Sequence, residues 1–374
     1  MITVHAVGDL VLETTDAAGL LAPVGETLRG ADVVIGHLEI PHLEGGIVHT
    51  TDVAAVPGPP SALDALADAG FDILTLAGNH VYDFGPEGIR ETRRHCEERG
   101  MQVAGVGETL DDAFAPALVS AGGVTVAVVS INCVGPRETW ATSLKPGAAY
   151  VDVVTHYEPR GANPGGPPRV HSFAEQTSLA RAVAAVRDAA SAADVVIVAL
   201  HKGLVHEPAR IADYEREVSH AMVDAGAQAV VSHHAHIGKG IEIYRGRPIL
   251  HGLGNFATVT RALALDGDDP GRAAWARERR RLFGFEPDPA MPTYPFHPES
   301  RHTMIAALTF DDGAVETALI PCWIDDDARP VPVGRSPRGE AVADYLRTIT
   351  ADAAFATDLA WSGDRLVARA TETP

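Results

Sequence analysis

Short apolar runs rich in valine and isoleucine alternate with longer segments of helical pattern along most of this chain. Such alternation is typical of an α/β domain. Several runs are apolar at every position rather than at every second one, which predicts strands that are buried on both faces. We expect strands at Thr3–Val7, Asp32–Ile35, Asp72–Leu76, Val124–Ile131, Asp194–Leu200, Gln228–Val231, Pro248–His251, Met304–Phe310 and Ala314–Ile320.

Polar residues and glycines mark the expected ends of the helices. Ser61 with Asp64, and Ser172 with Glu175, have the spacing of a capping box at a helix N-terminus. Glycine commonly follows the last turn of a helix. It stands at such places at Gly70, Gly100 and Gly226.

Two long segments interrupt the alternation. Residues 136–170 are rich in glycine and proline, and residues 257–302 contain an arginine-rich stretch from Arg277 to Arg281. Long irregular segments are often lids or binding loops, and surface excursions are the alternative. The arginines could reach an anionic substrate, although such a run more often forms a solvated helix face. We expect one domain over residues 1–330 that carries both insertions, with residues 331–374 adding one helix and one short strand.

Composition and charge exclude several classes of protein. With 374 residues, 46% of them hydrophobic, the chain can bury a large core without disulfides. Its net charge of −20 disfavours nucleic acid and anionic lipid as partners. Three cysteines are too few for a disulfide framework or a thiolate metal site. No apolar run approaches the roughly 18 residues of a membrane span, and no leader is evident, so we expect a cytoplasmic protein. A homo-oligomer is compatible with the sequence.

Polar side chains that can bind metals follow six of the predicted strands. In open α/β sheets, ligands bind in the crevice beyond the carboxyl ends of the strands. One polar residue after a strand is more often a turn former, but six such ends at one edge indicate a site. The residues are Asp9, then His37 and Glu39, then Asn79 and His80, then His201, then the run His233 to His236, and finally Asn255.

The types of these residues favour one kind of chemistry. Imidazole, carboxylate and amide oxygen, without thiolate, suit manganese, iron, zinc or cobalt. A carboxylate can bridge two such ions, and a pair of ions can activate water and stabilise developing negative charge. The sequence therefore predicts two divalent metal ions, with manganese preferred.

At these positions the chain resembles the capsule-synthesis protein family (CapA, or poly-γ-glutamate synthesis type), a branch of the calcineurin-like metallophosphoesterases. The resemblance implies an α/β/β/α sandwich. It covers roughly residues 1 to 320. The matching blocks are Gly8-Asp9, Leu38-Glu39-Ile40-Pro41, the run from Ala77 to Gly85, His201-Lys202-Gly203, the run from His233 to His236, and the run from Leu253 to Phe256.

The resemblance also implies roles for individual residues. Asp9 and His236 would hold one metal. Asn79, His201 and His234 would hold the other, with Glu39 as the bridging carboxylate. His80 resembles the histidine that protonates the leaving group in phosphoesterases. Asp83 would orient His80; its alternative role is that of a helix cap before Pro86.

The chain departs from the pattern of its relatives at several positions. Phosphoesterases usually have Asp-x-His on the first strand, but residue 11 is Val11. His37 and Lys202 replace the residues common in the capsule-synthesis branch. We expect Lys202 to grip an anionic substrate group, with an ordinary surface lysine as the alternative. His37, Glu207 and Asn255 are further candidates for substrate contact.

We therefore expect an enzyme, namely a hydrolase that uses two metal ions. Its metal-activated water would attack an amide, lactam or lactone bond of a small polar molecule. Two alternatives remain: a phosphoesterase of calcineurin type, and a non-catalytic protein related to capsule or poly-γ-glutamate. The sequence does not name the substrate.

Overall fold

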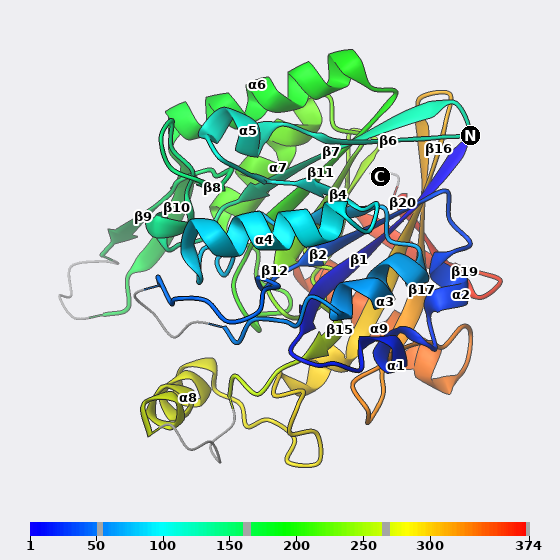
Figure 1. Cartoon of the computed structure of the whole chain (residues 1–374). Helices are drawn as coiled ribbons and strands as arrows, with labels where there is room; N and C mark the ends of the chain where they lie inside the picture. The colour runs from blue at the N-terminus through cyan, green and yellow to red at the C-terminus, as the bar shows by residue number, and fades with distance from the viewer. Residues whose placement is uncertain (51–54, 160–165, 264–269, 372–374) are drawn as a thin grey trace.

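Two mixed β-sheets form the centre of the computed structural model, which describes residues 1–50, 55–159, 166–263 and 270–371 (Figure 1). The first sheet has the order β19-β20-β17-β16-β1-β2-β3-β4, with β15 paired to β1 and β18 to β17. Its strands are β1 (Ile2–Leu12), β2 (Val33–Leu38), β3 (Ile73–Thr75), β4 (Gln102–Ala104), β15 (Asn255–Val259), β16 (His302–Asp311), β17 (Ala314–Ile324), β18 (Pro330–Pro332), β19 (Thr357–Ser362) and β20 (Arg365–Ala370).

The second sheet has the order β13-β14-β12-β11-β7-β6. Its strands are β6 (Ala117–Ala121), β7 (Val124–Asn132), β11 (Val195–Lys202), β12 (Ala229–His234), β13 (Ile241–Tyr244) and β14 (Arg247–Leu250). Two small ribbons complete the strands: β5 (Val106–Gly107) pairs with β8 (Gly147–Ala148), and β9 (Val153–Glu158) pairs with β10 (Arg169–Ala174).

All nine strands that the apolar runs predicted are present, as β1, β2, β3, β7, β11, β12, β14, β16 and β17. Every residue of β2 and β11 is buried, which explains their continuous apolar sequences. The strands that were not predicted are short or lie mostly at sheet edges, where the apolar pattern is weaker. The structure also has two strands, β19 and β20, where one was expected near the C-terminus.

Three apolar layers hold the elements together. The middle layer joins the two sheets and contains Val4 and Ile35 from one sheet with Val128 and Ile197 from the other. The helices α1 (Ala17–Leu21), α2 (Gly25–Leu28), α3 (Ala62–Ala69) and α4 (Gly85–Glu97) cover the first sheet. The helices α5 (Leu110–Phe114), α6 (Gln176–Ala192) and α7 (Asp213–Ala225) cover the second (Figure 1). The predicted α/β/β/α sandwich is confirmed.

The helix caps agree with the sequence only in part. Gly70 and Gly226 do end α3 and α7, both with positive φ. Ser61 makes no capping hydrogen bond, so the capping box predicted there was wrong. The second predicted box was wrong as well, because Ser172 lies in β10 and the side chain of Glu175 itself caps α6.

The strand β1 changes its neighbour halfway along its length, and this change places the candidate site. Residues 2–6 pair with β16, whereas Asp9 and the residues after it pair with β15. Close approach at the crossing point requires a glycine, since a Cβ on Gly8 would lie 1.9 Å from the carbonyl oxygen of Gly254. The strand was predicted to end at Val7, but pairing with β15 extends it to Leu12.

The two insertions contain regular structure of their own. The first holds η1 (Arg137–Thr139), β8 and the ribbon β9–β10, which projects from the body in Figure 1. The second holds α8 (Pro270–Phe283) and η2 (Pro298–Arg301). Residues 160–165 and 264–269 of these segments lie outside the described part. The last helix, α9 (Pro337–Asp352), packs into the layer between the sheets through Val342 and Leu346.

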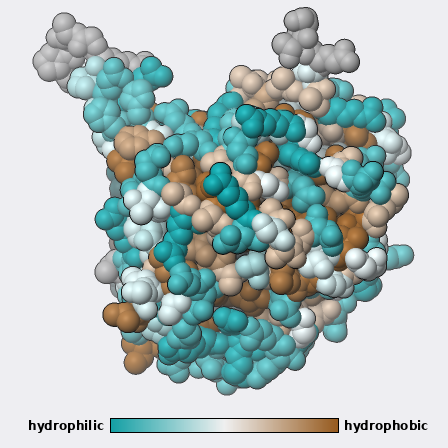
Figure 2. All heavy atoms as spheres, turned by 90° about the horizontal axis from the view of Figure 1, so that it is seen from above, coloured by the Kyte–Doolittle hydropathy of each residue, from teal (hydrophilic) through white to brown (hydrophobic). Residues whose placement is uncertain are grey.

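Polar residues dominate the face of the molecule in Figure 2, and apolar residues are interspersed among them. This agrees with 50 acidic and 30 basic residues in the chain. None of the helices in the described ranges combines the length and the apolar character needed to cross a bilayer.

Candidate metal centre

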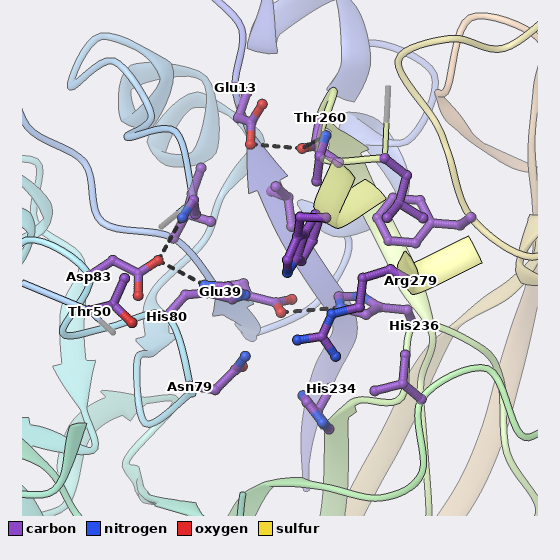
Figure 3. Close-up of a pocket in the computed structure, with 18 of the residues that line it drawn as sticks. Glu13, Glu39, Thr50, Asn79, His80, Asp83, His234, His236, Thr260 and Arg279 are labelled. Atoms are coloured by element: carbon purple, nitrogen blue, oxygen red, sulfur yellow. Dashed lines mark hydrogen bonds and ion pairs between the residues drawn. The ribbon is translucent and has the colours of Figure 1, made fainter. Parts of the chain in front are cut away.

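Strands from both sheets bring the predicted ligands together at one place. Figure 3 shows four of them, Glu39, Asn79, His234 and His236. Asp9 comes from β1, Glu39 follows β2, and Asn79 follows β3. His201 lies in β11, and His234 ends β12. The polar residues that the sequence placed at strand ends therefore lie close together in the structure.

These side chains form three overlapping groups in which the potential ligand atoms lie within 4.8 Å of one another. One group is Asp9, Glu39 and His236; another is Glu39, His201 and His234; the third is Asp9, His37 and His201. Each of Asp9, Glu39 and His201 belongs to two of the three groups, so the groups form one continuous cluster. Asn79 joins the second group, since its Oδ1 lies 2.8 Å from Nε2 of His201.

The residues fit a metal centre because buried polar atoms among them lack partners. Within the described residues, no hydrogen bond reaches Oδ2 of Asp9, Oε2 of Glu39, Nε2 of His37, Nδ1 of His201 or Nδ1 of His234. A buried unpaired polar atom costs about 1–3 kcal/mol, more when it is charged. Cations bound among these atoms would supply the partners that the atoms lack.

The backbone is also strained around the centre. His206, His234 and His236 have φ values of 60°, 88° and 53°. Residues with a Cβ rarely adopt this left-handed region, and the strain that they store tends to occur at functional sites.

Two of the potential ligands, Glu39 and His234, have the protonation states that metals require. Asp9 and His236 do not: burial and the charge of Glu39 raise the pKa of Asp9. Burial opposes ionisation of Glu39, but the neighbouring His236 outweighs burial and lowers the pKa of Glu39 to about 2. Burial lowers the pKa of His234 to about 3. At neutral pH these two groups are therefore an anion and a neutral imidazole, the forms that bind metals. Burial also opposes protonation of His236, but Glu39 and Asp9 raise its pKa to about 9, so a metal that bound this imidazole would have to displace a proton.

A histidine and an aspartate form a dyad beside the ligands. Nδ1 of His80 lies 2.8 Å from Oδ2 of Asp83. Burial lowers the pKa of His80, but the hydrogen bond and charge of Asp83 outweigh burial and raise it above the ordinary value. Asp83 also accepts a hydrogen bond from the backbone N–H of Ala55 at 2.7 Å. The alternative role of Asp83 as a helix cap is not observed among the described residues. The helix α4 begins after Phe84, and no described side chain makes a capping hydrogen bond there.

A cavity of about 320 Å³ opens above the centre. Glu39, Asn79, His80, Asp83, His234 and His236 all contribute to its lining. Side chains of the second insertion close the opposite side, and they include Arg272, Trp275, Arg279, Phe283 and Phe296. Its size is at the lower end of the range for small-molecule pockets.

Lys202 does not reach this cavity, and its predicted substrate contact is wrong. Successive residues of a strand point to opposite faces, so Lys202 turns away where His201 faces the centre. Its side chain is fully buried, with Nζ 3.2 Å from Oε2 of Glu215 and 3.0 Å from Nδ1 of His251. It is neither a substrate ligand nor the surface lysine of the alternative interpretation.

The other three predicted substrate contacts also have different positions. Glu207 is exposed and absent from the described cavity lining, where its neighbour His206 lies instead. Asn255 is buried behind His236, to which it hydrogen-bonds. His37 is buried beneath the centre, and its ring stacks on His233 with centroids 4.8 Å apart. His37 belongs with the potential ligands rather than with the substrate.

Sequence reasoning missed the cavity residues Glu13 and Trp275, and it named Arg279 only as one of several arginines that could reach an anionic substrate. Glu13 lines the cavity because β1 is longer than predicted, and its Oε1 accepts a hydrogen bond from Thr260 at 2.7 Å (Figure 3). Burial raises the pKa of Glu13. Trp275 and Arg279 lie four residues apart in α8. Helical spacing within the arginine-rich stretch was the signal that could have found them.

The layers and the clustered ligands define an α/β/β/α protein with a candidate metal centre. The chain belongs to the bacterial capsule synthesis protein family PGA_cap, whose model matches residues 3–260.

Several curated proteins are similar in sequence. An uncharacterized protein of Sinorhizobium fredii is 31% identical over 307 residues, which are 68% of this chain and 65% of that protein. The PGA biosynthesis protein CapA of Bacillus subtilis is 26% identical over 66% of this chain and 58% of its own length. A probable polyglutamine synthesis accessory protein of Mycobacterium tuberculosis is 28% identical over 62% of this chain and 55% of its own length. The matches thus span less than two thirds of these relatives.

Solved structures show a similar but distant likeness. A hypothetical protein from Thermus thermophilus has a TM-score of 0.45 and 15% identity, covering 86% of this chain and 99% of that one. The calcineurin-like phosphoesterase YfkN of Bacillus subtilis has a TM-score of 0.35 and 12% identity, covering 94% of this chain and 97% of that one.

Proposed function

We propose that this chain is a hydrolase that uses two divalent metal ions, manganese preferred, to cleave an amide, lactam or lactone bond of a small polar molecule. The observation that carries the proposal is the convergence of Asp9, Glu39, His201, His234 and His236, with unpaired buried atoms, beneath a cavity that also contains a histidine–aspartate dyad.

The metal ligands and the dyad would divide the work between them. Asp9 and His236 would hold one ion, Asn79, His201 and His234 the other, and Glu39 both. When bound, such ions supply an activated water and stabilise the negative charge that develops on the substrate.

The residues of the dyad would handle the proton. His80 lines the cavity, and its hydrogen bond to Asp83 favours the protonated imidazole. The proton on Nε2 can then pass to the leaving amine or alkoxide, which is general acid catalysis. Asp83 fixes the orientation of the ring, because its carboxylate accepts a hydrogen bond from the N–H at Nδ1.

Two observations support cleavage of a carbon-based bond. Val11 lines the cavity at the place where phosphoesterases usually have a histidine. Most of the remaining wall is apolar or aromatic, through residues such as Ile40, Leu263 and Phe283. This wall suits a small organic acid derivative better than it suits a bare phosphate.

A hydrolysis panel tests the proposal. Manganese-loaded protein would be assayed with N-acyl amino acids, lactams, lactones, phosphomonoesters and phosphodiesters. We expect turnover of an acyl compound that chelation abolishes and that His80→Gln lowers by at least about 100-fold while metal content stays unchanged. Acyl hydrolysis that survives complete metal removal would overturn the metal mechanism. Turnover of phosphoesters alone would overturn the assigned bond class.

A further inference from the structure

One face of α8 forms a wall of the cavity opposite the metal ligands. Arg272, Trp275, Arg279 and Phe283 all line the cavity. Their spacings of three and four residues place them on a single face of the helix. Arg277 and Arg281 lie on the other face and are exposed. Arginine therefore occurs both on the face of α8 that lines the cavity and on the face that is exposed to solvent.

Arg279 extends from this face toward the metal ligands. Figure 3 shows its side chain directed toward Glu39, His234 and His236. Its guanidinium carbon lies 5.2 Å from the ring centroid of Trp275, a cation–π distance that orients the planar group. The indole Nε1 of Trp275 is buried, and no hydrogen-bond partner for it exists among the described residues.

The charge of the loaded site favours an anion. When bound, two divalent ions would bring four positive charges to the site, and the carboxylates of Asp9 and Glu39 would supply two negative charges. Arg279 and Arg272 place two guanidinium groups in the opposite wall. These cationic groups stand in a chain whose net charge is −20. A positively charged cavity in an acidic protein concentrates anionic ligands where they can react.

We infer that α8 is the substrate-recognition wall of this site. Arg279 binds an oxyanion of the substrate, either a carboxylate or a phosphate-like group, and Trp275 packs on the carbon skeleton between that group and the metals. The substrate class is thus a small molecule with an oxyanion at the end remote from the scissile bond. This inference rests on the proposed function for the reaction at the metal end, but the recognition step itself needs no turnover.

Calorimetry with simple acids tests the recognition step. The probes are straight-chain dicarboxylates of four to seven carbons, the monocarboxylates of equal length, and the matching phosphonocarboxylates, each titrated into manganese-loaded protein. The metal ions can bind one carboxylate of any probe. A gain in affinity from the second oxyanion therefore measures its binding to Arg279. We expect at least one dianionic probe to bind about 10- to 100-fold more tightly than its monocarboxylate. Comparison of the dicarboxylates with the phosphonocarboxylates then shows which oxyanion binds more tightly.

Substitutions in α8 assign that preference to one residue. Arg279→Gln should abolish it and leave monocarboxylate binding unchanged. Arg279→Lys should retain part of it, because lysine keeps the charge but loses the planar fork. Arg277→Gln, on the solvent face of the same helix, is the matched control and should retain all of it. Thermal melting of each variant checks that it is folded.

Two results would overturn the inference: the absence of any preference for dianionic probes in the wild type, or a preference that persists in folded Arg279→Gln. Binding without hydrolysis of any acyl compound would contradict the proposed reaction alone. Hydrolysis without an effect of Arg279 on binding would contradict the recognition role alone.

Discussion

Nδ1 of His236 lies 2.9 Å from Oδ1 of Asn255, and Asn255 in turn donates from Nδ2 to the hydroxyl of Tyr294 at 3.2 Å. The first bond places a proton on Nδ1 of the imidazole and leaves Nε2 for a metal. That Nε2 atom lies 3.3 Å from Oε1 of Glu39. A buried amide therefore sets the orientation of a potential ligand, as is common around protein metal sites.

Removal of this amide should weaken metal binding without unfolding the protein. We expect Asn255→Leu to reduce the affinity of the Asp9–His236 site by about 10- to 100-fold, since His236 loses the acceptor that holds its ring. Asn255→Asp keeps an acceptor at the same position and should restore most of the affinity. Calorimetric titration with Mn²⁺ measures both. Equal affinities in the wild type and a folded Asn255→Leu variant would show that Asn255 does not position His236.

Loss of the dyad carboxylate should slow the reaction rather than remove the metals. Asp83→Asn deprives His80 of the charge that favours its protonated form, and we expect kcat to fall by about 10- to 100-fold on the substrate that the hydrolysis panel identifies. The metal-to-protein ratio should not change, because Asp83 belongs to none of the ligand groups found among the described residues. A variant with normal kcat would exclude a role for the dyad in proton transfer.

The buried ion cluster around Lys202 should matter for stability. Glu215 is fully buried, and its carboxylate lies 3.2 Å from Nζ of Lys202 and 3.7 Å from Nζ of Lys239. Glu215→Gln would leave both lysines buried without an anion, and we expect a loss of about 3–5 kcal/mol in the free energy of unfolding.

Urea denaturation of metal-free protein measures this loss. The surface pair of Glu108 with Arg90 supplies the control, because both side chains are more than half exposed. Glu108→Gln should cost less than about 1 kcal/mol. A similarly small cost for Glu215→Gln would mean that the lysines find other partners or lose their protons.

Buried neutral histidines should make the protein labile to acid. Burial, assisted by Arg365, lowers the pKa of His5 to about 4 from an ordinary value of 6.5. The unfolded chain then binds a proton that the folded chain does not, so this group's contribution to stability is present above pH 6.5 and is lost toward pH 4.

The substitution His5→Leu tests the acid effect. It should reduce the loss of stability between about pH 6.5 and 4 by about 3 kcal/mol, as measured by urea denaturation at each pH. The exposed His156 in β9 is the control, since its replacement removes no buried imidazole. The same pH dependence in the wild type and His5→Leu would show that His5 is protonated without cost.

The fold and the ligand cluster could be predicted from the sequence because both follow from local patterns. Strands buried on both faces have continuous apolar sequences, and the residues at their carboxyl ends meet at one edge of a sheet. Asp9, Glu39 and His201 were found in this way. Edge strands such as β13 and the ribbon β9–β10 lack that burial and carry no comparable signal.

The features that sequence reasoning missed depend on contacts between distant segments. His201 and Lys202 are adjacent, and only the strand geometry shows that one faces the cluster of potential ligands and the other a buried carboxylate. Glu13 enters the cavity because β15 extends β1 beyond its expected end. Arg279 could not be separated from Arg277 until the packing of α8 showed which face is covered.

The number of metal ions per chain tests the central claim most directly. Protein purified without added metal or chelator, or incubated afterwards with Mn²⁺, Fe²⁺ and Zn²⁺, would be analysed by elemental mass spectrometry. We predict about two transition-metal ions per chain, falling to about one or fewer in Glu39→Gln, because Glu39 belongs to two of the three ligand groups. A ratio near zero in the wild type after incubation with all three metals would contradict the account.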